Sequence, residues 1–459
     1  MRPEHAVVIG GSVAGLLAAG AAAKHFDRVT ILERDELLEG PVIRKGAPQG
    51  NQIHILLPIG EASIEELFPG IRDELIAEGC DQYNHAGDIP SLTSLGWKTR
   101  VRMAALDVLA FRRPLLEWVI RRRLLRLENV TVRQATVTGF TLDDHRSNLT
   151  GVTVKNGEPV AADLVIDAGG RGTKSPKWLK ELGFEAPEEA EVRIYIGYAT
   201  QFLKVRPDLF PPGTRGISTH PQPVQPVGGV ILPSDNGVFA AAAFGMMKRY
   251  PPADQEGLVE FLAGAPTPLL SEIVRDAEPV SDIHTYRMSG NRRRHWETLE
   301  HRPGRFVATG DAVASLNPTY GQGLTLAAFG AKFLDEALGT RGATVDNVPG
   351  DFQSALASTV DAAFLLTVRG DIAYEGAEIV NYDPPSEEEM EYLDRLSELS
   401  AAGDTEVAEA LAMASYTLRP ELLETEELRL KVETTPAPPK RAFDVRQYPT
   451  SVHPERSRV

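Results

Sequence analysis

Short apolar runs alternate with longer amphipathic stretches in the first part of the chain, as expected of strands alternating with helices. The run HAVVIG at 5–10 predicts a buried strand, and after a glycine turn the Ala- and Leu-rich stretch 13–23 predicts a helix. RVTILERD at 28–35 predicts a second strand, and 112–127 predicts an amphipathic helix. This order is that of a βαβ unit, which favours a parallel sheet covered by helices.

The pattern changes between residues 181 and 300. Proline and glycine become frequent there, and short alternating runs such as RIYIGYATQFLKV and GGVILP predict a separate, largely antiparallel sheet. Helical periodicity dominates from 351 to 432. We therefore expect an α/β protein in which a doubly wound, Rossmann-like domain is interleaved with a mostly antiparallel sheet and followed by C-terminal helices.

Composition narrows the class of protein. The 459-residue chain has a formal net charge of −16, which disfavours nucleic acid or an anionic membrane surface as a partner. Cys80 is the only cysteine, so we expect no intramolecular disulfide and no metal site built on thiolates. The apolar stretch 13–23 is too short to span a membrane, and a strand begins where a signal peptide would lie. We expect a cytoplasmic protein; its oligomeric state stays open.

A glycine motif separates the first predicted strand from the first predicted helix. The residues Gly10-Gly11-Ser12-Val13-Ala14-Gly15 form a G-x-S-x-x-G version of the dinucleotide-binding turn. Glu33 ends the second strand, where a carboxylate accepts hydrogen bonds from an adenosine ribose. A glycine-rich core turn is the alternative interpretation of the motif alone, but with Glu33 the pattern favours FAD or NAD over NADP.

A second strand, turn and helix unit occurs at 305–331, far from the glycine motif. The strand RFVAT leads into Gly310-Asp311, and Pro318 and the Gly321-Gln322-Gly323 turn precede a helix. A NAD dehydrogenase has no need of such a unit, whereas FAD extends well beyond its pyrophosphate. Asp311 would accept from a ribityl hydroxyl, and the backbone amides from Gly321 to Leu324 would face the pyrimidine end of the flavin. The pair of units predicts FAD.

Six segments with different roles occur in the order of a known family: GGSVAGLLAA, RKGAPQGNQIH, FRRPLLEWVIRRRL, ADLVIDAGGRGTKSP, NRRRHWE and GDAVASLNPTYGQGLTLAA. Together they resemble the FAD-dependent monooxygenases of the group that contains p-hydroxybenzoate hydroxylase and squalene epoxidase. The likeness is closest to the bacterial polyether polyketide epoxidases, and it covers about residues 5–375. Residues from 385 onward lie outside the resemblance.

The resemblance implies roles for residues at matching positions. Arg44 would lie near the FAD phosphates and ribityl chain, Arg113 on the ribityl side, and the backbone of Val137 beside the adenine. Pro318 would lie beside the flavin edge where oxygen reacts, and with Gly321 it would position that edge; no side-chain nucleophile and no metal is expected. The candidate cofactor-binding residues are Gly10, Gly11, Ser12, Ala14, Gly15, Glu33, Arg34, Arg44, Lys45, Arg113, Val137, Asp311, Pro318, Gly321, Gly323 and Leu324.

The reaction is also implied by the resemblance. It would use tightly but non-covalently bound FAD, NAD(P)H as reductant and O2 as co-substrate, and a flavin C4a-hydroperoxide would pass one oxygen atom to an apolar small molecule. We expect epoxidation of a polyene or polyketide alkene in antibiotic biosynthesis. An aromatic or alicyclic hydroxylase, an alkene-saturating flavin reductase and a non-catalytic flavin-binding scaffold stay open. So does supply of reduced flavin by a partner flavin reductase.

The domain boundaries follow from these motifs. We expect a discontinuous FAD-binding domain at 1–75, 101–180 and 281–345, a substrate domain at 76–100 and 181–280, a helical region at 350–432 and a flexible tail at 433–459. Three side chains leave two interpretations open. His54 lines the flavin edge or is a core histidine, and Tyr198 and Tyr286 belong to the core or to the rim of a substrate site.

Overall fold

A five-stranded parallel sheet forms one layer of the computed structural model, which describes residues 3–438 and 444–454. Its strand order is β19, β12, β1, β2, β8. Its strands are β1 (His5–Ile9), β2 (Arg28–Glu33), β8 (Val130–Gln134), β12 (Leu164–Asp167) and β19 (Phe306–Ala308). Strand β19 reaches this sheet only after the chain has passed through a second sheet. The expected Rossmann-like sheet is thus confirmed, and its edge comes from late in the chain.

Helices α1 (Val13–Ala23), α5 (Arg113–Leu124), α9 (Gly323–Gly339) and α10 (Val348–Asp371) accompany this sheet. Helix α1 packs against both α5 and α9, and nearly all of its residues are buried. This agrees with its Ala- and Leu-rich sequence, which has no polar face. A small antiparallel sheet of β9 (Val137–Leu142), β10 (Leu149–Val154) and β11 (Val160–Ala161) precedes β12.

The second large sheet has ten strands and is antiparallel except for the pairing of β14 with β4. Its strands are β4 (Ser91–Thr93), β5 (Gly96–Trp97), β13 (Glu189–Lys204), β14 (Ile217–Thr219), β15 (Val227–Pro233), β16 (Phe239–Gly245), β17 (Glu278–Pro279), β18 (His284–Arg294), β20 (Ala314–Ser315) and β21 (Glu378–Val380). The long β13 pairs with β16, β17, β18 and β21. Helices α7 (Gln255–Ala263) and α8 (Leu269–Asp276) pack on β15, and the expected separate sheet is confirmed.

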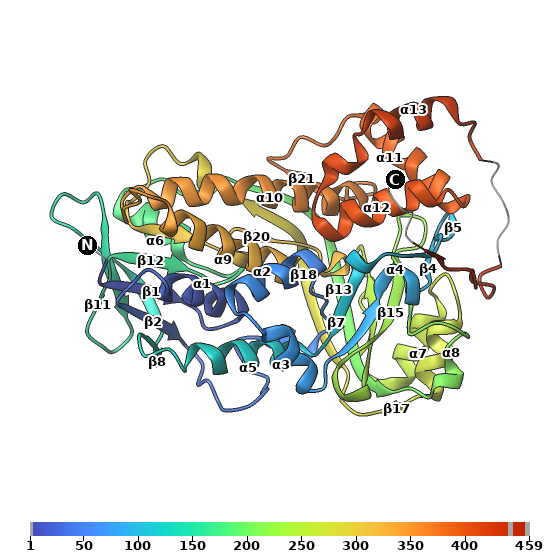
Figure 1. Cartoon of the computed structure of the whole chain (residues 1–459), viewed down its shortest axis with the longest axis horizontal. Coiled ribbons are helices and arrows are strands. Elements are labelled where there is room, and N and C mark those ends of the chain that lie inside the picture. The colour runs from blue at the N-terminus through green and yellow to red at the C-terminus, as the bar shows by residue number, and fades with distance from the viewer. Residues whose placement is uncertain (1–2, 439–443, 455–459) are drawn as a thin grey trace.

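The last helices stand over one end of this sheet (Figure 1). They are α11 (Glu387–Ala401), α12 (Thr405–Thr417) and α13 (Glu426–Thr434), and they share a small core that includes Leu396 and Val407. Helix α12 packs against α2 (Pro58–Leu67) and β6 (Val101–Arg102). Of the tail expected at 433–459, residues 439–443 and 455–459 lie outside the described residues, and β22 (His453–Pro454) pairs with β6.

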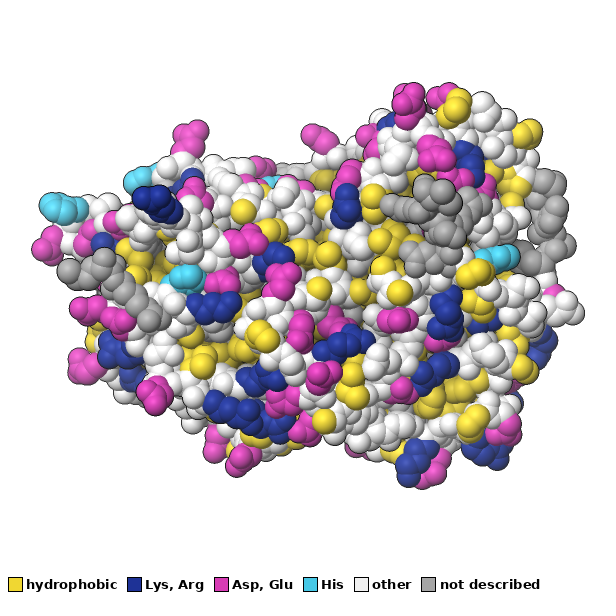
Figure 2. Space-filling model, in the orientation of Figure 1, with side chains coloured by type: hydrophobic (Ala, Val, Ile, Leu, Met, Phe, Trp, Pro, Cys, Tyr) yellow, Lys and Arg dark blue, Asp and Glu magenta, His cyan; other side chains and the backbone are white. Residues whose placement is uncertain are grey.

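The remaining elements are α3 (Ile71–Ala77), α4 (His85–Asp88), α6 (Ser175–Leu182), β3 (Asp81–Asn84) and β7 (Asp107–Ala110). On the face shown in Figure 2, acidic and basic side chains are interspersed. Within residues 3–438 and 444–454, no helix is both long enough and apolar enough to cross a membrane.

Candidate active site

The turn between β1 and α1 requires glycine at two positions. Gly10 has a φ of 100°, and a Cβ there would lie 2.6 Å from the backbone oxygen of Ala168. A Cβ on Gly15 would lie only 1.9 Å from the backbone oxygen of Gly10. These contacts bring α1 close to the sheet, so the start of the helix, at Val13 and Ala14, faces an internal cavity. The predicted strand, turn and helix are confirmed.

Charged side chains lie beneath this turn. The amide of Gly11 donates to Glu33 Oε2 at 2.7 Å, and Arg44 Nη1 lies 3.4 Å from the same oxygen. Arg44 Nε also donates to Glu117 Oε1 at 3.0 Å, and Ser12 Oγ donates to Glu117 Oε2 at 2.8 Å. The structure therefore brings Glu33 and Arg44 together, and Arg44 supports the turn through its contact with the Gly11 carbonyl.

Arg113 connects the turn to the second predicted unit. Its Nη2 donates to Ser12 Oγ at 2.9 Å and its Nη1 lies 3.3 Å from His54 Nε2, while its buried Nε has no partner among the described residues. Burial and the charge of Arg113 lower the pKa of His54 to about 3, so the ring is neutral. Its Nδ1 donates to the Gln52 carbonyl at 2.9 Å, which leaves Nε2 to accept from Arg113. Burial raises the pKa of Asp311, and the charge of Arg113 opposes that rise.

The turn after β19 carries the other predicted cofactor residues. Pro318 begins a short 3₁₀ helix that the Asn317 side chain caps, and Gly321, with a φ of 70°, ends it. Helix α9 begins at Gly323, and the side chain of its N-cap residue, Gln322, does not cap the amides of its first turn. A Cβ on Gly323 would find no atom within 4 Å, so the space in front of this helix end is open. Uncapped amides facing open space suit an electron-rich ligand.

A buried carboxylate from α10 supports the Pro318 turn. Asp371 Oδ2 accepts from Asn291 Nδ2 at 2.7 Å and from Asn317 Nδ2 at 3.0 Å, and Oδ1 lies 3.3 Å from the Tyr320 hydroxyl. Burial raises the pKa of Asp371 to about 7, against the effect of these hydrogen bonds. The sequence did not indicate this residue, because it lies in a helix without a recognisable motif.

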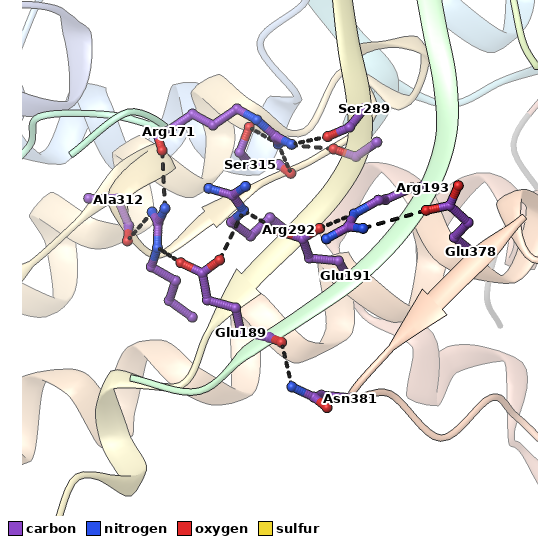
Figure 3. A network of polar contacts seen from close by, with 12 residues as sticks. Arg171, Glu189, Glu191, Arg193, Ser289, Arg292, Ala312, Ser315, Glu378 and Asn381 are labelled. Atoms are coloured by element: carbon purple, nitrogen blue, oxygen red, sulfur yellow. Dashed lines mark hydrogen bonds and ion pairs between the residues drawn. The ribbon is translucent and has the colours of Figure 1, made fainter. Parts of the chain in front are cut away.

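Arginines join the loop after β12 to the antiparallel sheet (Figure 3). Arg171 Nη1, from the DAGGRG segment, donates to the Gly290 carbonyl at 2.9 Å and to Ser315 Oγ at 3.0 Å. Arg294, from NRRRHWE, donates to Glu189 Oε1 at 2.7 Å and to the Ala312 carbonyl at 3.2 Å. These contacts tie the backbone around Asp311 to both sheets, so its position depends on residues far apart in the sequence.

The predicted residues meet around one cavity of about 1100 Å³. Those that line it are Ser12, Ala14, Arg34, Arg113, Asp311, Pro318, Gly321, Gly323 and Leu324. Gly10, Gly11, Gly15, Glu33 and Arg44 belong to the glycine turn and its support. Lys45 is exposed and Val137 lies on β9, and neither lines the cavity.

The cavity continues from these residues toward the antiparallel sheet and the C-terminal helices. Its apolar wall comes from Val230, Leu232, Phe244, Met288, Leu366 and Leu411. Tyr198 and Tyr286 also line it, with ring centroids 5.5 Å apart. His54 lines it as well, so the structure places all three side chains that the sequence left open at the cavity.

These features fit FAD. The glycine turn has room for a phosphate, and Asp311 and Arg113 line the same cavity as the open space at Gly323. The buried Nε of Arg113, which has no partner among the described residues, and the Asp311 carboxylate could bind polar groups of an elongated cofactor. Among the described residues, no three His, Cys, Asp or Glu side chains are placed to hold a metal ion. The fold and the cavity together define a flavin-dependent oxidoreductase.

Comparison with known proteins also identifies a FAD-dependent oxidoreductase. The model of the FAD-dependent oxidoreductase family matches residues 6–175. Protein Rv3254 of Mycobacterium tuberculosis (strain ATCC 25618 / H37Rv) is 31% identical over 390 residues, which are 82% of this chain and 81% of the relative. The chain belongs to the FAD-dependent oxidoreductase family; it is an enzyme, and FAD is its cofactor.

Solved structures show the same fold. The flavin-dependent brominase Bmp2 is 18% identical, with a TM-score of 0.61, over 80% of this chain and 88% of its own. PqsL of Pseudomonas aeruginosa, solved in complex with 2-aminobenzoylacetate, is 16% identical, with a TM-score of 0.62, over 80% of this chain and 95% of its own. The fold is therefore that of flavin-dependent monooxygenases and hydroxylases.

Proposed function

We propose that the protein is a FAD-dependent monooxygenase that transfers one oxygen atom from O2 to an apolar natural-product molecule. Epoxidation of a polyene or polyketide alkene is the reaction that we favour. The supporting observation is the cavity of about 1100 Å³, which continues from the Pro318 turn to an apolar wall. A molecule on that wall would lie in the same cavity as the predicted flavin edge.

The residues of the chain would act by binding and positioning. When bound, FAD supplies the redox and oxygen-activating chemistry. Glu33 would accept from the ribose, Asp311 would accept from the ribityl chain, and the uncapped amides at the start of α9 would donate to the pyrimidine end. Pro318 would flank the reacting edge, and the apolar wall would orient the substrate and exclude water.

Purified enzyme tests the proposal. NADH and NADPH oxidation, oxygen uptake and product mass are measured with polyenes and with phenols. Oxygen uptake with a product one oxygen atom heavier and one double bond poorer supports epoxidation, whereas ring hydroxylation identifies a hydroxylase. Alkene reduction without oxygen uptake identifies a saturating reductase, and halide incorporation a halogenase. If NAD(P)H alone gives no reduction, photochemically reduced enzyme tests the need for a partner flavin reductase, and a flavin that no donor reduces identifies a scaffold.

A further inference from the structure

Basic side chains gather on the side of the cavity away from the glycine turn. They are His85 at the start of α4, Lys98 after β5, His220 after β14 and Arg369 near the end of α10. Figure 1 shows α4 and β4 at the opposite end of the molecule from β1. The parallel pairing of β14 with β4, with Ser218 opposite Ser91, brings two of these segments together.

The two cations in this group have no partner among the described residues. No side-chain hydrogen bond or ion pair of Lys98 or Arg369 occurs within residues 3–438 and 444–454. Asp394 also lines the cavity and is near enough for its charge to raise the pKa of Arg369, but it forms no ion pair with it. Arg293 and Arg294, in contrast, are both paired with carboxylates. Lys98 is exposed and Arg369 is half-buried, and both line the cavity, so two cations that no described carboxylate pairs with face this space. Such an arrangement suits an anion.

The four side chains line the same cavity, and their charges affect one another's pKa values. Desolvation by the protein around the cavity lowers the pKa of Lys98, and the charge of Arg369 lowers it further. Burial and the charge of Lys98 lower the pKa of His85 to about 4 and that of His220 to about 3. At neutral pH both rings are therefore uncharged, and the buried Nδ1 of His85 has no partner among the described residues. Two cations and two neutral rings face one space.

We propose that Lys98, Arg369 and the two histidines form a carboxylate-binding subsite, so that the oxygen acceptor is an apolar molecule with one carboxylate group. This rests on the proposed function, because it assumes that the cavity holds the substrate. Two cations opposed by Asp394 leave one net positive charge, which matches a monoanion better than a phosphate dianion. The FAD phosphates belong at the Gly10–Gly15 turn, so this anion is not the cofactor's.

Such a subsite would select the atom that reacts. An apolar wall alone allows a hydrophobic molecule to slide, whereas one anchored end fixes the distance from the carboxylate to the reacting double bond. A Cβ on Gly370, the residue after Arg369, would lie 2.5 Å from the Tyr320 hydroxyl, and Tyr320 belongs to the Pro318 turn. The anchor therefore lies next to the predicted flavin edge.

Binding to the FAD-loaded enzyme tests the subsite. The probes are 10-undecenoic acid and trans-cinnamic acid, each compared with its primary amide by isothermal titration calorimetry. Of the two acids, we expect the one that binds more tightly to bind about tenfold more tightly than its own amide. Lys98→Gln and Arg369→Gln should remove most of that difference in affinity without weakening the binding of the amide. Lys98→Arg should retain it. The matched control is Lys204→Gln, an exposed lysine at the end of β13.

The outcomes separate the subsite from the proposed function. FAD content and thermal unfolding of each variant show whether it has folded, and oxygen uptake on the same samples tests oxygenation independently. Discrimination between acid and amide without oxygen transfer supports the subsite and counts against the monooxygenase. No discrimination in the wild type, or equal weakening of acid and amide in the variants, overturns the subsite. It is also overturned if the variants raise only the KM for NADH or NADPH, because the anion would then be the reductant.

Discussion

The two halves of the cavity are built in different ways. The half that faces the predicted flavin uses backbone turns at Gly10–Gly15 and Gly310–Gly323, each between a strand and a helix. The half that faces the predicted substrate is lined by residues of β15, β16, α10 and α12. A cofactor shared by many enzymes can be held by conserved geometry, whereas a particular substrate needs side chains that change without disturbing the fold.

Disrupting the glycine turn should have the largest effect on FAD binding and on stability. Gly15→Val places its Cβ where a carbonyl oxygen lies 1.9 Å away, which we expect to cost about 3 kcal/mol or more of unfolding free energy and to abolish FAD retention. The FAD-to-protein ratio and a thermal unfolding curve measure this. Gly50→Ala is the control, because a Cβ there makes only ordinary contacts. A Gly15→Val protein with full FAD content contradicts our account of the turn.

The junction of the two halves should respond to pH. The pKa of Asp371 rises from its ordinary value of 3.8 to about 7 on folding, so the folded state binds the proton more tightly. The contribution of this group to the free energy of unfolding is fully present below about pH 4 and is lost as the pH rises through 7. The total loss is about 4 kcal/mol. Asp371→Asn should flatten that part of the slope in urea unfolding from pH 5 to pH 8. An unchanged slope would show that Asp371 titrates normally.

Asp311 tests the cofactor half with a smaller change. Asp311→Ala should weaken FAD binding about tenfold or more, because a ribityl hydroxyl loses its acceptor, and Asp311→Asn should weaken it less. Fluorescence titration of the FAD-free protein with FAD gives the constants. Asp276→Ala, an exposed change on α8, controls for the loss of charge. Equal FAD affinity in all three variants would remove Asp311 from the site.

The smallest effect is expected on the substrate half. Leu411→Ala trims the part of the cavity wall that α12 provides, and we expect about three- to tenfold weaker binding of an apolar probe with FAD content unchanged. Calorimetry with 10-undecenamide measures it, and Leu430→Ala, an exposed leucine of α13, is the control. If Leu411→Ala loses FAD instead, the two halves are not separable in the way that we describe.

Predictability from the sequence follows the same division. The glycine turn, Glu33 and Asp311 lie in contiguous segments whose backbone conformation restricts the residue types. The sequence pattern could therefore predict them. Lys98, His220 and Arg369 come from segments that only the β14 and β4 pairing and the end of α10 bring together. Helices α11 and α12 carried no motif either, and the sequence did not indicate that they close the cavity. Side-chain proximity across long stretches of chain leaves no local signal.

The position of β19 has a consequence for how the protein is made. This edge strand of the parallel sheet, together with Asp311 and α9, follows strands β13 to β18 of the antiparallel sheet in the chain. A ribosome therefore releases β1, α1 and β2 long before their last neighbour exists, and the substrate sheet has time to form first. The predicted FAD-binding residues are all present only when residue 324 has emerged, so we expect the enzyme to acquire its cofactor late in synthesis.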